Sequence, residues 1–254
     1  MTDISISLTV LLPVRNETMN LRVMLRILQA VLVVPHEIIV IFDRAEDSSA
    51  AVVEEMRQVY PQVRALLNTA GRGVAFAIRA GGEAARGERI LIFAADEVGP
   101  VLAIDDMMAL MDEGVEFVSA TRYAHGGRRL GGSIIGQMLS RAANRLLYAF
   151  SGTGLTDSTT GIKMFRRRDF DRLSRDTKSV GWAVAFEMAI NAHLLALRMG
   201  EVPIISIDRL FGGRSSVELV PWVIGYFSYF ATGISRLPRA KRPHVAVRIP
   251  VGMG

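Results

Sequence analysis

Apolar runs alternate with amphipathic stretches through the first half of the chain. Short apolar runs bounded by charged or turn residues predict buried strands, and longer stretches with apolar positions three and four apart predict helices. The predicted strands are residues 8–12, 37–42, 89–95 and 115–120, and the predicted helices are 17–33, 48–59, 73–86 and 103–111. Strands joined through helices need crossover connections, so this pattern predicts an α/β fold with a mostly parallel sheet covered by helices on both faces.

The second half of the chain has a different pattern. A basic, glycine-rich loop at 126–132 precedes a helix in which apolar positions share one face: Ile135, Met138, Leu139, Ala142, Leu146 and Leu147. An amphipathic helix is then predicted at 185–198 and a strand at 201–210. We expect this half to form one wall of a cleft over the sheet.

Polar side chains follow the predicted strands at the points where they end. They are Arg15, Asn16 and Glu17, then Asp43 and Asp47, then Asp96 and Glu97, and finally Arg122. Ligands of such sheets bind beyond the carboxyl ends of the strands. Carboxylates there can hold a divalent cation that contacts phosphate oxygens, and arginines can bind those oxygens directly. The recurrence of these residues at one edge predicts a site, although each acid alone can be a loop residue or a cap, as Asp47 is placed to be before "SSAAVVEEM".

Two glycines lie at the start of the helix predicted at 73–86. Gly71 and Gly73 would let the backbone approach a ligand closely, but Phe76 stands where a dinucleotide fingerprint needs its third glycine. The pair therefore argues against a nicotinamide-dependent enzyme.

Composition excludes several kinds of chemistry. The 254 residues are half hydrophobic, which is typical of a globular chain, and none is cysteine. Disulfides, thiolate nucleophiles and cysteine-based metal sites are thereby excluded. The apolar run at the N-terminus follows Asp3 and is short, so we expect no secretion signal and a cytoplasmic protein.

The net charge of +5 is concentrated at the C-terminus. Five basic residues and no acid follow Ser235, while the rest of the chain has equal numbers of basic and acidic residues. A basic tail at 236–254 suggests an anionic partner, either lipid or nucleic acid, and a solvated tail is the alternative.

The segment just before this tail is uncharged and aromatic. Residues 219–235 barely reach the length of a membrane span, and Trp222, Tyr226 and Tyr229 recur at helical spacing. Such a face is typical of a helix lying in a membrane interface. Docking on the protein's own core and a true span are the alternatives.

Seven motifs occur in the order and spacing of family 2 glycosyltransferases with the GT-A fold. They are "LTVLLPVRNE", "EIIVIFDRAEDSS", "GRGVAFAIRAGGEAARGERILIFAADEVGP", "SATRYAHGG", "SRAANRLL", "DSTTGIKMFRR" and "EVPIISIDRLFGGRSS". The chain resembles in particular the dolichyl- or polyprenyl-phosphate mannosyltransferases and their bacterial relatives. The resemblance runs from about residue 7 to 216 and implies a GT-A domain at 1–216. The aromatic helix expected at 217–235 and the basic tail at 236–254 lie outside it.

The resemblance implies an inverting transfer of a sugar from a nucleotide-diphosphate sugar, GDP-mannose or a UDP-sugar, to a lipid phosphate of the polyprenyl or dolichyl type. Residues matching the family's nucleotide-binding motifs are Pro13, Asn16, Glu17, Asp43, Asp47 and Gly73. Asp96 matches the last acid of the Asp-x-Asp motif that holds Mg²⁺ or Mn²⁺, and Arg122 matches an arginine that faces phosphate. Asp157 falls in the acceptor-side motif together with Gly161 and Lys163, and Arg209 matches a late arginine. The C-terminus lies outside the resemblance, but with a lipid-phosphate acceptor its aromatic helix and basic tail are expected to contact an anionic membrane peripherally, with no nucleic-acid partner.

The chain departs from the family pattern at informative positions. Phe42 and Ala94 stand where the first acids of two motifs usually are, and Arg44-Ala45 replaces Gly-Ser. Gly136 stands where an acceptor-side arginine is common, and Ser216 where the late motif has lysine. Asp96 is then the main protein carboxylate available to a cation, since Mg²⁺ can be held by one carboxylate together with substrate phosphate and water.

Two other functions fit parts of this pattern. The thinned metal motif allows a catalytically silent binding or scaffold protein of the same fold. A nucleotidyltransferase would share the sheet and its acidic edge, but it would normally have a glycine-rich signature near the N-terminus, and "LLPVRNETMN" has no glycine.

Overall fold

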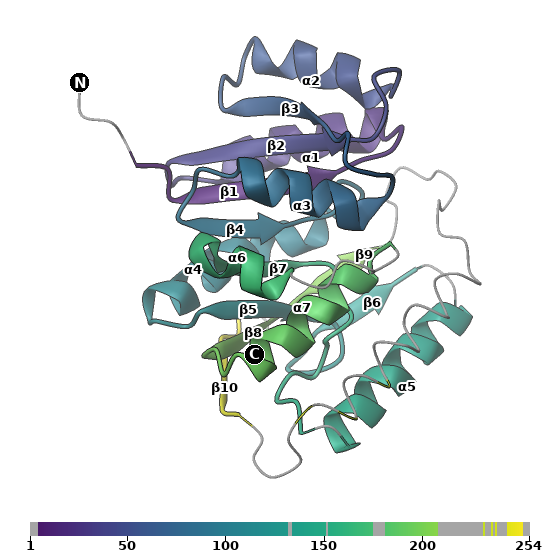
Figure 1. Cartoon of the computed structure of the whole chain (residues 1–254), viewed down its shortest axis with the longest axis vertical. Helices are drawn as coiled ribbons and strands as arrows, with labels where there is room; N and C mark the ends of the chain where they lie inside the picture. The colour runs from purple at the N-terminus through teal and green to yellow at the C-terminus, as the bar shows by residue number, and fades with distance from the viewer. Residues whose placement is uncertain are drawn as a thin grey trace.

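An eight-stranded sheet forms the centre of the molecule (Figure 1). The computed structural model describes residues 5–131, 134–150, 152–174, 181–207, 231, 235, 237 and 243–250. The strand order is β10-β8-β5-β7-β4-β1-β2-β3, and β6 and β9 form a separate two-stranded sheet. The strands are β1 (Leu8–Pro13), β2 (His36–Phe42), β3 (Val63–Leu67), β4 (Arg89–Ile92), β5 (Phe117–Thr121), β6 (Arg128–Leu130), β7 (Lys163–Arg166), β8 (Met199–Pro203), β9 (Ile205–Ile207) and β10 (Val245–Val247). All pairings are parallel except those of β7, which runs antiparallel between β4 and β5.

Helices cover both faces of the sheet. They are α1 (Thr18–Val31), α2 (Ser49–Arg57), α3 (Val74–Ala84), the 3₁₀ helix η1 (Gly99–Ala103), α4 (Ile104–Asp112), α5 (Ile134–Phe150), the 3₁₀ helix η2 (Arg167–Asp169), α6 (Phe170–Leu173) and α7 (Ala183–Leu194). Side chains alternate along each strand, so Val10 and Leu12 pack with α1, α2 and α4, while Leu11 packs with α3, α6 and α7. Two apolar layers therefore enclose the sheet. They fix its strand tips as a rigid edge.

The predicted α/β architecture is confirmed, with differences in individual elements. The strand predicted at 89–95 ends at Ile92, the helix predicted at 185–198 ends at Leu194, and the strand predicted at 201–210 is divided into β8 and β9. Four strands were not predicted: β3, β6, β7 and β10. β3 is an edge strand with alternating exposure, and β7 is four residues long and buried inside a motif.

Part of the predicted basic tail belongs to the sheet. β10 pairs in parallel with β8, and the backbone N–H of Arg248 donates to the carbonyl of Glu201 at 3.1 Å. The Arg248 side chain forms ion pairs with Asp106 and Glu113, both at 2.9 Å. These residues were expected outside the domain, but an edge strand forms here because β8 offers unpaired backbone groups.

Of the predicted helix at 217–235, only residues 231 and 235 are described, so its relation to a membrane lies outside the described residues. Within the described part of the chain, no helix is both long enough and apolar enough to cross a membrane.

Candidate functional site

The carboxyl edge of the sheet brings together polar residues from four strands. Asp43 follows β2, Asn16 follows β1, Asp96 follows β4 and Arg122 follows β5. Neighbouring strands lie about 4.8 Å apart, so the tip of β2 is about 10 Å from the tip of β4, with β1 between them. The tip of β5 lies at a similar interval on the other side, beyond β7. The edge can therefore hold an elongated polar ligand across several strands.

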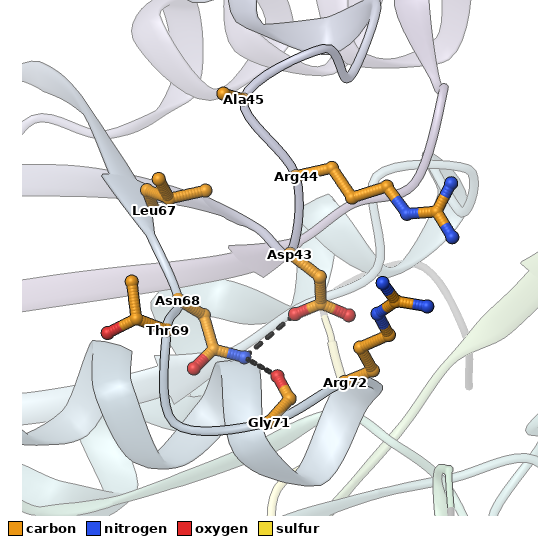
Figure 2. Close-up of a pocket in the computed structure, with 8 residues that line it drawn as sticks. All are labelled: Asp43, Arg44, Ala45, Leu67, Asn68, Thr69, Gly71 and Arg72. Atoms are coloured by element: carbon orange, nitrogen blue, oxygen red, sulfur yellow. Dashed lines mark hydrogen bonds between the residues drawn. The ribbon is translucent and has the colours of Figure 1, made fainter.

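A pocket of about 410 Å³ opens at the tips of β2 and β3. Figure 2 shows the residues that line it: Asp43, Arg44, Ala45, Leu67, Asn68, Thr69, Gly71 and Arg72. The Asp43 carboxylate accepts hydrogen bonds from Asn68 Nδ2 at 2.7 Å and from the backbone N–H of Gly73 at 2.6 Å. Asn68 Nδ2 also donates to the Gly71 carbonyl at 2.6 Å. Asp43 thus ties the loop after β2 to the loop before α3, and its own position is fixed.

Gly73 has a backbone requirement that explains why glycine occupies it. Its φ is +105°, in a region that side chains disfavour, while a Cβ there would have open space around it. The conformation, and not lack of room, therefore selects glycine. The Gly73 N–H reaches Asp43, so two residues predicted to share one nucleotide site do lie together.

Asn16 and Asp47 form a reciprocal lock between the loops after β1 and β2. The Asp47 carboxylate accepts the backbone N–H of Asn16 at 3.0 and 3.1 Å and that of Ser49 at 2.8 Å. Asn16 has a φ of +55°, and its side-chain oxygen accepts the N–H of Ser48. Asp47 is buried and satisfies the first turn of α2, which is the capping role that the sequence allowed.

Pro13 and Glu17 belong to the same corner. Pro13 is the buried last residue of β1, in register with Ile41 of β2. The N–H of Glu17 donates to Ser49 Oγ, and its carboxylate accepts a hydrogen bond from Asn20. These residues shape the loop next to the pocket, and none of them lines it.

Asp96 and Glu97 lie half-buried beyond the tip of β4. Ser206 of β9 donates to Glu97 Oε2 at 3.1 Å, which directs one Glu97 oxygen toward the small sheet. Burial raises the pKa of Glu97 and so does the Asp96 charge, while the charges of Arg122 and Arg129 oppose the rise. The acidic pair and the two arginines are therefore electrostatic neighbours.

Arg122 and Asp157 form a buried bidentate ion pair. Arg122 Nε lies 2.7 Å from Asp157 Oδ2, and Arg122 Nη2 lies 3.0 Å from Asp157 Oδ1. Burial alone would lower the pKa of the arginine and raise that of the carboxyl, but their mutual attraction reverses both shifts. Both groups stay charged. The fork geometry fixes the guanidinium plane in one orientation.

The loop that carries Asp157 is held on both sides by buried charged groups. Lys163 Nζ donates to Ser119 Oγ at 2.6 Å and, more weakly, to the Asp157 carbonyl at 3.4 Å. Glu201 accepts the N–H groups of Thr156 at 2.7 Å and Asp157 at 3.1 Å. In the sequence, Lys163 falls in the acceptor-side motif without a predicted role. Glu201 is not predicted as a site residue, since nothing local marks a strand glutamate as a partner of a distant loop.

Burial shifts the protonation of both supporting groups toward neutral pH. Desolvation lowers the pKa of Lys163 to about 7, against the opposing charges of Asp157 and Glu201. Desolvation likewise raises the pKa of Glu201 to about 7, against its hydrogen bonds from the Asp157 and Thr156 backbone. Lys163 and Glu201, which hold the loop that carries Asp157, therefore both titrate near neutral pH.

A divalent cation fits this edge only when the ligand supplies part of its coordination. Among the described residues, no three His, Cys, Asp or Glu side chains are grouped so that they could hold a metal alone. The Asp96 carboxylate at the strand tip suits Mg²⁺ or Mn²⁺ as one oxygen ligand, with phosphate oxygens and water completing the shell. Ala94, two residues earlier, offers no oxygen from its side chain.

Arg209 lies outside the described residues. Asp43 and Gly73 meet at the pocket, Asp96 stands at the centre of the edge, and Arg122 and Asp157 meet beyond β5. Asn16, Glu17 and Asp47 instead connect loops that frame the edge.

Comparison with known proteins identifies chains of similar sequence. The model of the family described as "Glycosyl transferase family 2" matches residues 9–174. Glycosyltransferase AglD of Haloferax volcanii is 27% identical over 100% of this chain and 40% of its own length. The dolichol-phosphate mannosyltransferase of Mycosarcoma maydis is 24% identical over 78% of this chain and 69% of its own. The undecaprenyl-phosphate 4-deoxy-4-formamido-L-arabinose transferase of Klebsiella pneumoniae is 27% identical over 80% and 61%.

Solved structures confirm the predicted GT-A fold. Glucosyl-3-phosphoglycerate synthase of Mycobacterium tuberculosis, in complex with Mn²⁺, UDP and glucosyl-3-phosphoglycerate, has a TM-score of 0.67 at 16% identity, covering 92% of this chain and 81% of its own. The same protein with Mg²⁺ and UDP gives the same score. The chain spans only 40% of the AglD length and 61% of the Klebsiella transferase length.

Proposed function

The chain belongs to glycosyl transferase family 2, and on that premise we propose that it moves a sugar from a nucleoside-diphosphate donor to a polyprenyl- or dolichyl-phosphate acceptor, with inversion. The dolichol-phosphate and undecaprenyl-phosphate transferases among its relatives support this acceptor class. The observation that carries the proposal is the spacing of the pocket, Asp96 and Arg122 along one edge of the sheet.

The donor would extend along the strand tips. The pocket beside Asp43 would take the nucleoside, because Leu67 and Thr69 offer it a surface and Asn68 and Gly73 hold Asp43 in place. Two strands further along, Asp96 would face the diphosphate. UDP in the neighbouring transferase structures makes uridine a reasonable donor base, and GDP is the alternative that the mannosyltransferase relative suggests.

Asp96 is the residue that would hold Mg²⁺ or Mn²⁺. The cation, when bound, would neutralise negative charge that develops on the departing diphosphate. Glu97 would contribute less, because one of its oxygens accepts a hydrogen bond from Ser206. Arg129, whose charge acts on Glu97, would add positive potential to the same part of the edge.

Arg122 would orient the acceptor phosphate. Asp157 holds the guanidinium plane through two hydrogen bonds, so Arg122 presents its charge without needing to reorganise. A phosphate acceptor is already anionic at neutral pH and needs no strong general base. Asp157 therefore acts as a positioning residue, because its buried carboxylate is fully engaged with Arg122, Asn144 and Thr159.

A lipid acceptor requires the protein to work at a membrane surface. We therefore place it on the cytoplasmic side of a membrane, held peripherally by the aromatic segment 217–235 and the basic residues at 236–242. Arg248, also within the predicted tail, is paired with acids of the domain.

A silent binding or scaffold role is the second candidate, and the single acid of the metal motif favours it. It predicts nucleotide binding without transfer. Both the transferase and the silent binding protein should bind nucleotide, so calorimetry distinguishes these two candidates from a protein that binds no nucleotide.

The test titrates the full chain with UDP and GDP, each with and without Mn²⁺. We expect one of them to bind in a cation-dependent manner, and Asp96→Asn to weaken that binding about tenfold or more, because the neutral amide is a poor cation ligand. Asp105→Asn is the matched control, since Asp105 is an exposed acid of α4. Binding that is equal in wild type and Asp96→Asn would remove Asp96 from the cation site. Failure of both nucleotides to bind would overturn the donor assignment.

A further inference from the structure

Helix α5 has its polar and apolar faces reversed relative to an ordinary surface helix. Its inward side carries Ser140, Asn144 and Leu147, one turn apart. Five large apolar side chains are exposed instead: Ile134 at 75%, Met138 at 68%, Leu139 at 47%, Leu146 at 45% and Phe150 at 60%. Isolated exposed apolar residues are common, but a group of five on one helix marks a surface that contacts another apolar phase or partner.

The exposed apolar residues form one continuous stripe. With 3.6 residues per turn, positions 134, 138, 139, 146 and 150 fall on one side of the helix, together with the small residues Ala142 and Ala149. Figure 1 shows α5 set apart from the helices that cover the sheet. The exposed fractions of its side chains leave the stripe open to a partner.

The charge of α5 indicates the chemistry of that partner. The helix has two arginines, Arg141 and Arg145, and no acid. Both arginines are exposed along one border of the stripe, and Arg128 is exposed on β6, which precedes α5 in the chain. An apolar face bordered only by positive charge is complementary to a bilayer with anionic headgroups, into which the apolar side chains insert while the arginines remain at headgroup level.

The opposite face of α5 reaches the Arg122–Asp157 pair directly. Asn144 Nδ2 donates to Asp157 Oδ1 at 3.2 Å and to Thr159 Oγ1 at 2.8 Å. Ser140 Oγ lies 2.9 Å from Thr159 Oγ1 and accepts a hydrogen bond from Tyr123. One helix thus connects the exposed stripe to the charged pair beyond β5.

We propose that α5 is a membrane-docking helix that inserts its stripe into an anionic bilayer and sets the height of Arg122 above the headgroups. This surface is distinct from the C-terminal segment. The docking itself stands on α5 alone, whereas its benefit to a lipid-phosphate acceptor rests on the proposed function.

The test measures sedimentation of the full chain with phosphatidylcholine vesicles, with and without phosphatidylglycerol. We expect Met138→Glu/Phe150→Glu to weaken binding to the anionic vesicles at least about tenfold, because two apolar anchors are lost and negative charge is added. Val59→Glu/Leu102→Glu is the matched control. Val59 lies in the turn after α2 and Leu102 in η1, and their side chains are 69% and 73% exposed. The control is expected to bind as wild type does.

A tail variant separates the two membrane contacts. Replacing Arg236, Arg239, Lys241 and Arg242 by Gln is expected to leave part of the vesicle binding, and the α5 change is expected to remove that part. Nucleotide binding by calorimetry should survive the α5 change, so a failed donor assignment and a failed docking surface give different results.

Three outcomes would overturn the proposal. The first is vesicle binding that is unchanged in Met138→Glu/Phe150→Glu. The second is a wild-type dimer, measured by light scattering, that the α5 change converts to monomer, which would assign the stripe to a second copy. The third is a wild-type chain that binds no vesicle of either composition, which would leave the stripe to another segment of this chain.

Discussion

At the scale of single residues, the site depends on a few buried charged side chains. Arg122 and Asp157 are both buried, and removing one partner of such a pair typically costs about 3–5 kcal/mol because the other charge remains uncompensated. Lys163 is fully buried, and no carboxylate of the described residues lies within hydrogen-bonding distance of it, so its ammonium group relies on Ser119 and a carbonyl. We infer that the protein accepts this cost because Lys163 and Glu201 hold the Asp157 peptide from both sides.

Lys163 makes a specific prediction about pH. The folded protein releases the Lys163 proton above about pH 7, whereas the unfolded chain keeps it to near the ordinary pKa of 10.5. The unfolded state therefore binds more protons in this window, and this group adds stability as pH rises from about 7 toward 10. The contribution to the free energy of unfolding has a slope of up to about 1.4 kcal/mol per pH unit. Below about pH 7 both states keep this proton, so Lys163 then adds no pH dependence to the free energy of unfolding.

Urea unfolding of wild type and Lys163→Met between pH 7 and 10 tests this. The difference in unfolding free energy between the two should rise with pH in favour of wild type. Glu201→Gln gives an independent comparison with the opposite sign: because the pKa of Glu201 is raised, the wild-type carboxyl loses stability as pH rises from about 4.5 to 7. Parallel pH profiles in wild type and Lys163→Met would contradict the titration of Lys163.

At the scale of elements, the last strand connects the C-terminus to the site. β10 pairs with β8, and the Arg248 N–H donates to the carbonyl of Glu201, whose side chain holds the Asp157 loop. The ion pairs of Arg248 are on the surface, where such pairs usually contribute less than about 1 kcal/mol. The backbone hydrogen bond should therefore matter more than the side chain.

Two substitutions at one position separate these contributions. Arg248→Gln removes the ion pairs and should change the free energy of unfolding by less than about 1 kcal/mol. Arg248→Pro also removes the N–H, and we expect it to cost about 1–2 kcal/mol more and to speed amide hydrogen exchange in β8. Equal effects of the two variants on exchange in β8 would show that β10 does not support that strand.

At the scale of the whole molecule, local pattern predicted the layers but not the complete sheet order. Four strands and four helices of the first half follow from periodicity, since each has its own apolar pattern. β7 was not predicted because "KMFR" is short, and only its insertion between β4 and β5 makes it a central strand. β10 was not predicted because its pairing partner is more than forty residues away in sequence.

The candidate site was likewise predicted only in part, because local pattern does not reveal contacts between residues that are distant in sequence. The strand-tip residues were predicted because parallel strands place their carboxyl ends together, and Asp43, Asp96 and Arg122 do follow β2, β4 and β5 at one edge. What the sequence did not separate is which residues face the ligand and which connect loops. Asp47 and Asn16 use their polar atoms on each other's loops, and only the folded geometry shows this.

The central claim is that this edge transfers a sugar to a lipid phosphate. The most direct measurement follows sugar label from the donor that calorimetry selects into the lipid fraction of vesicles containing polyprenyl phosphate. We predict transfer that depends on Mn²⁺ or Mg²⁺, that Asp96→Asn reduces about tenfold or more, and that Asp105→Asn leaves unchanged. Nucleotide binding without any label entering the lipid fraction would contradict the claim and favour a silent binding protein.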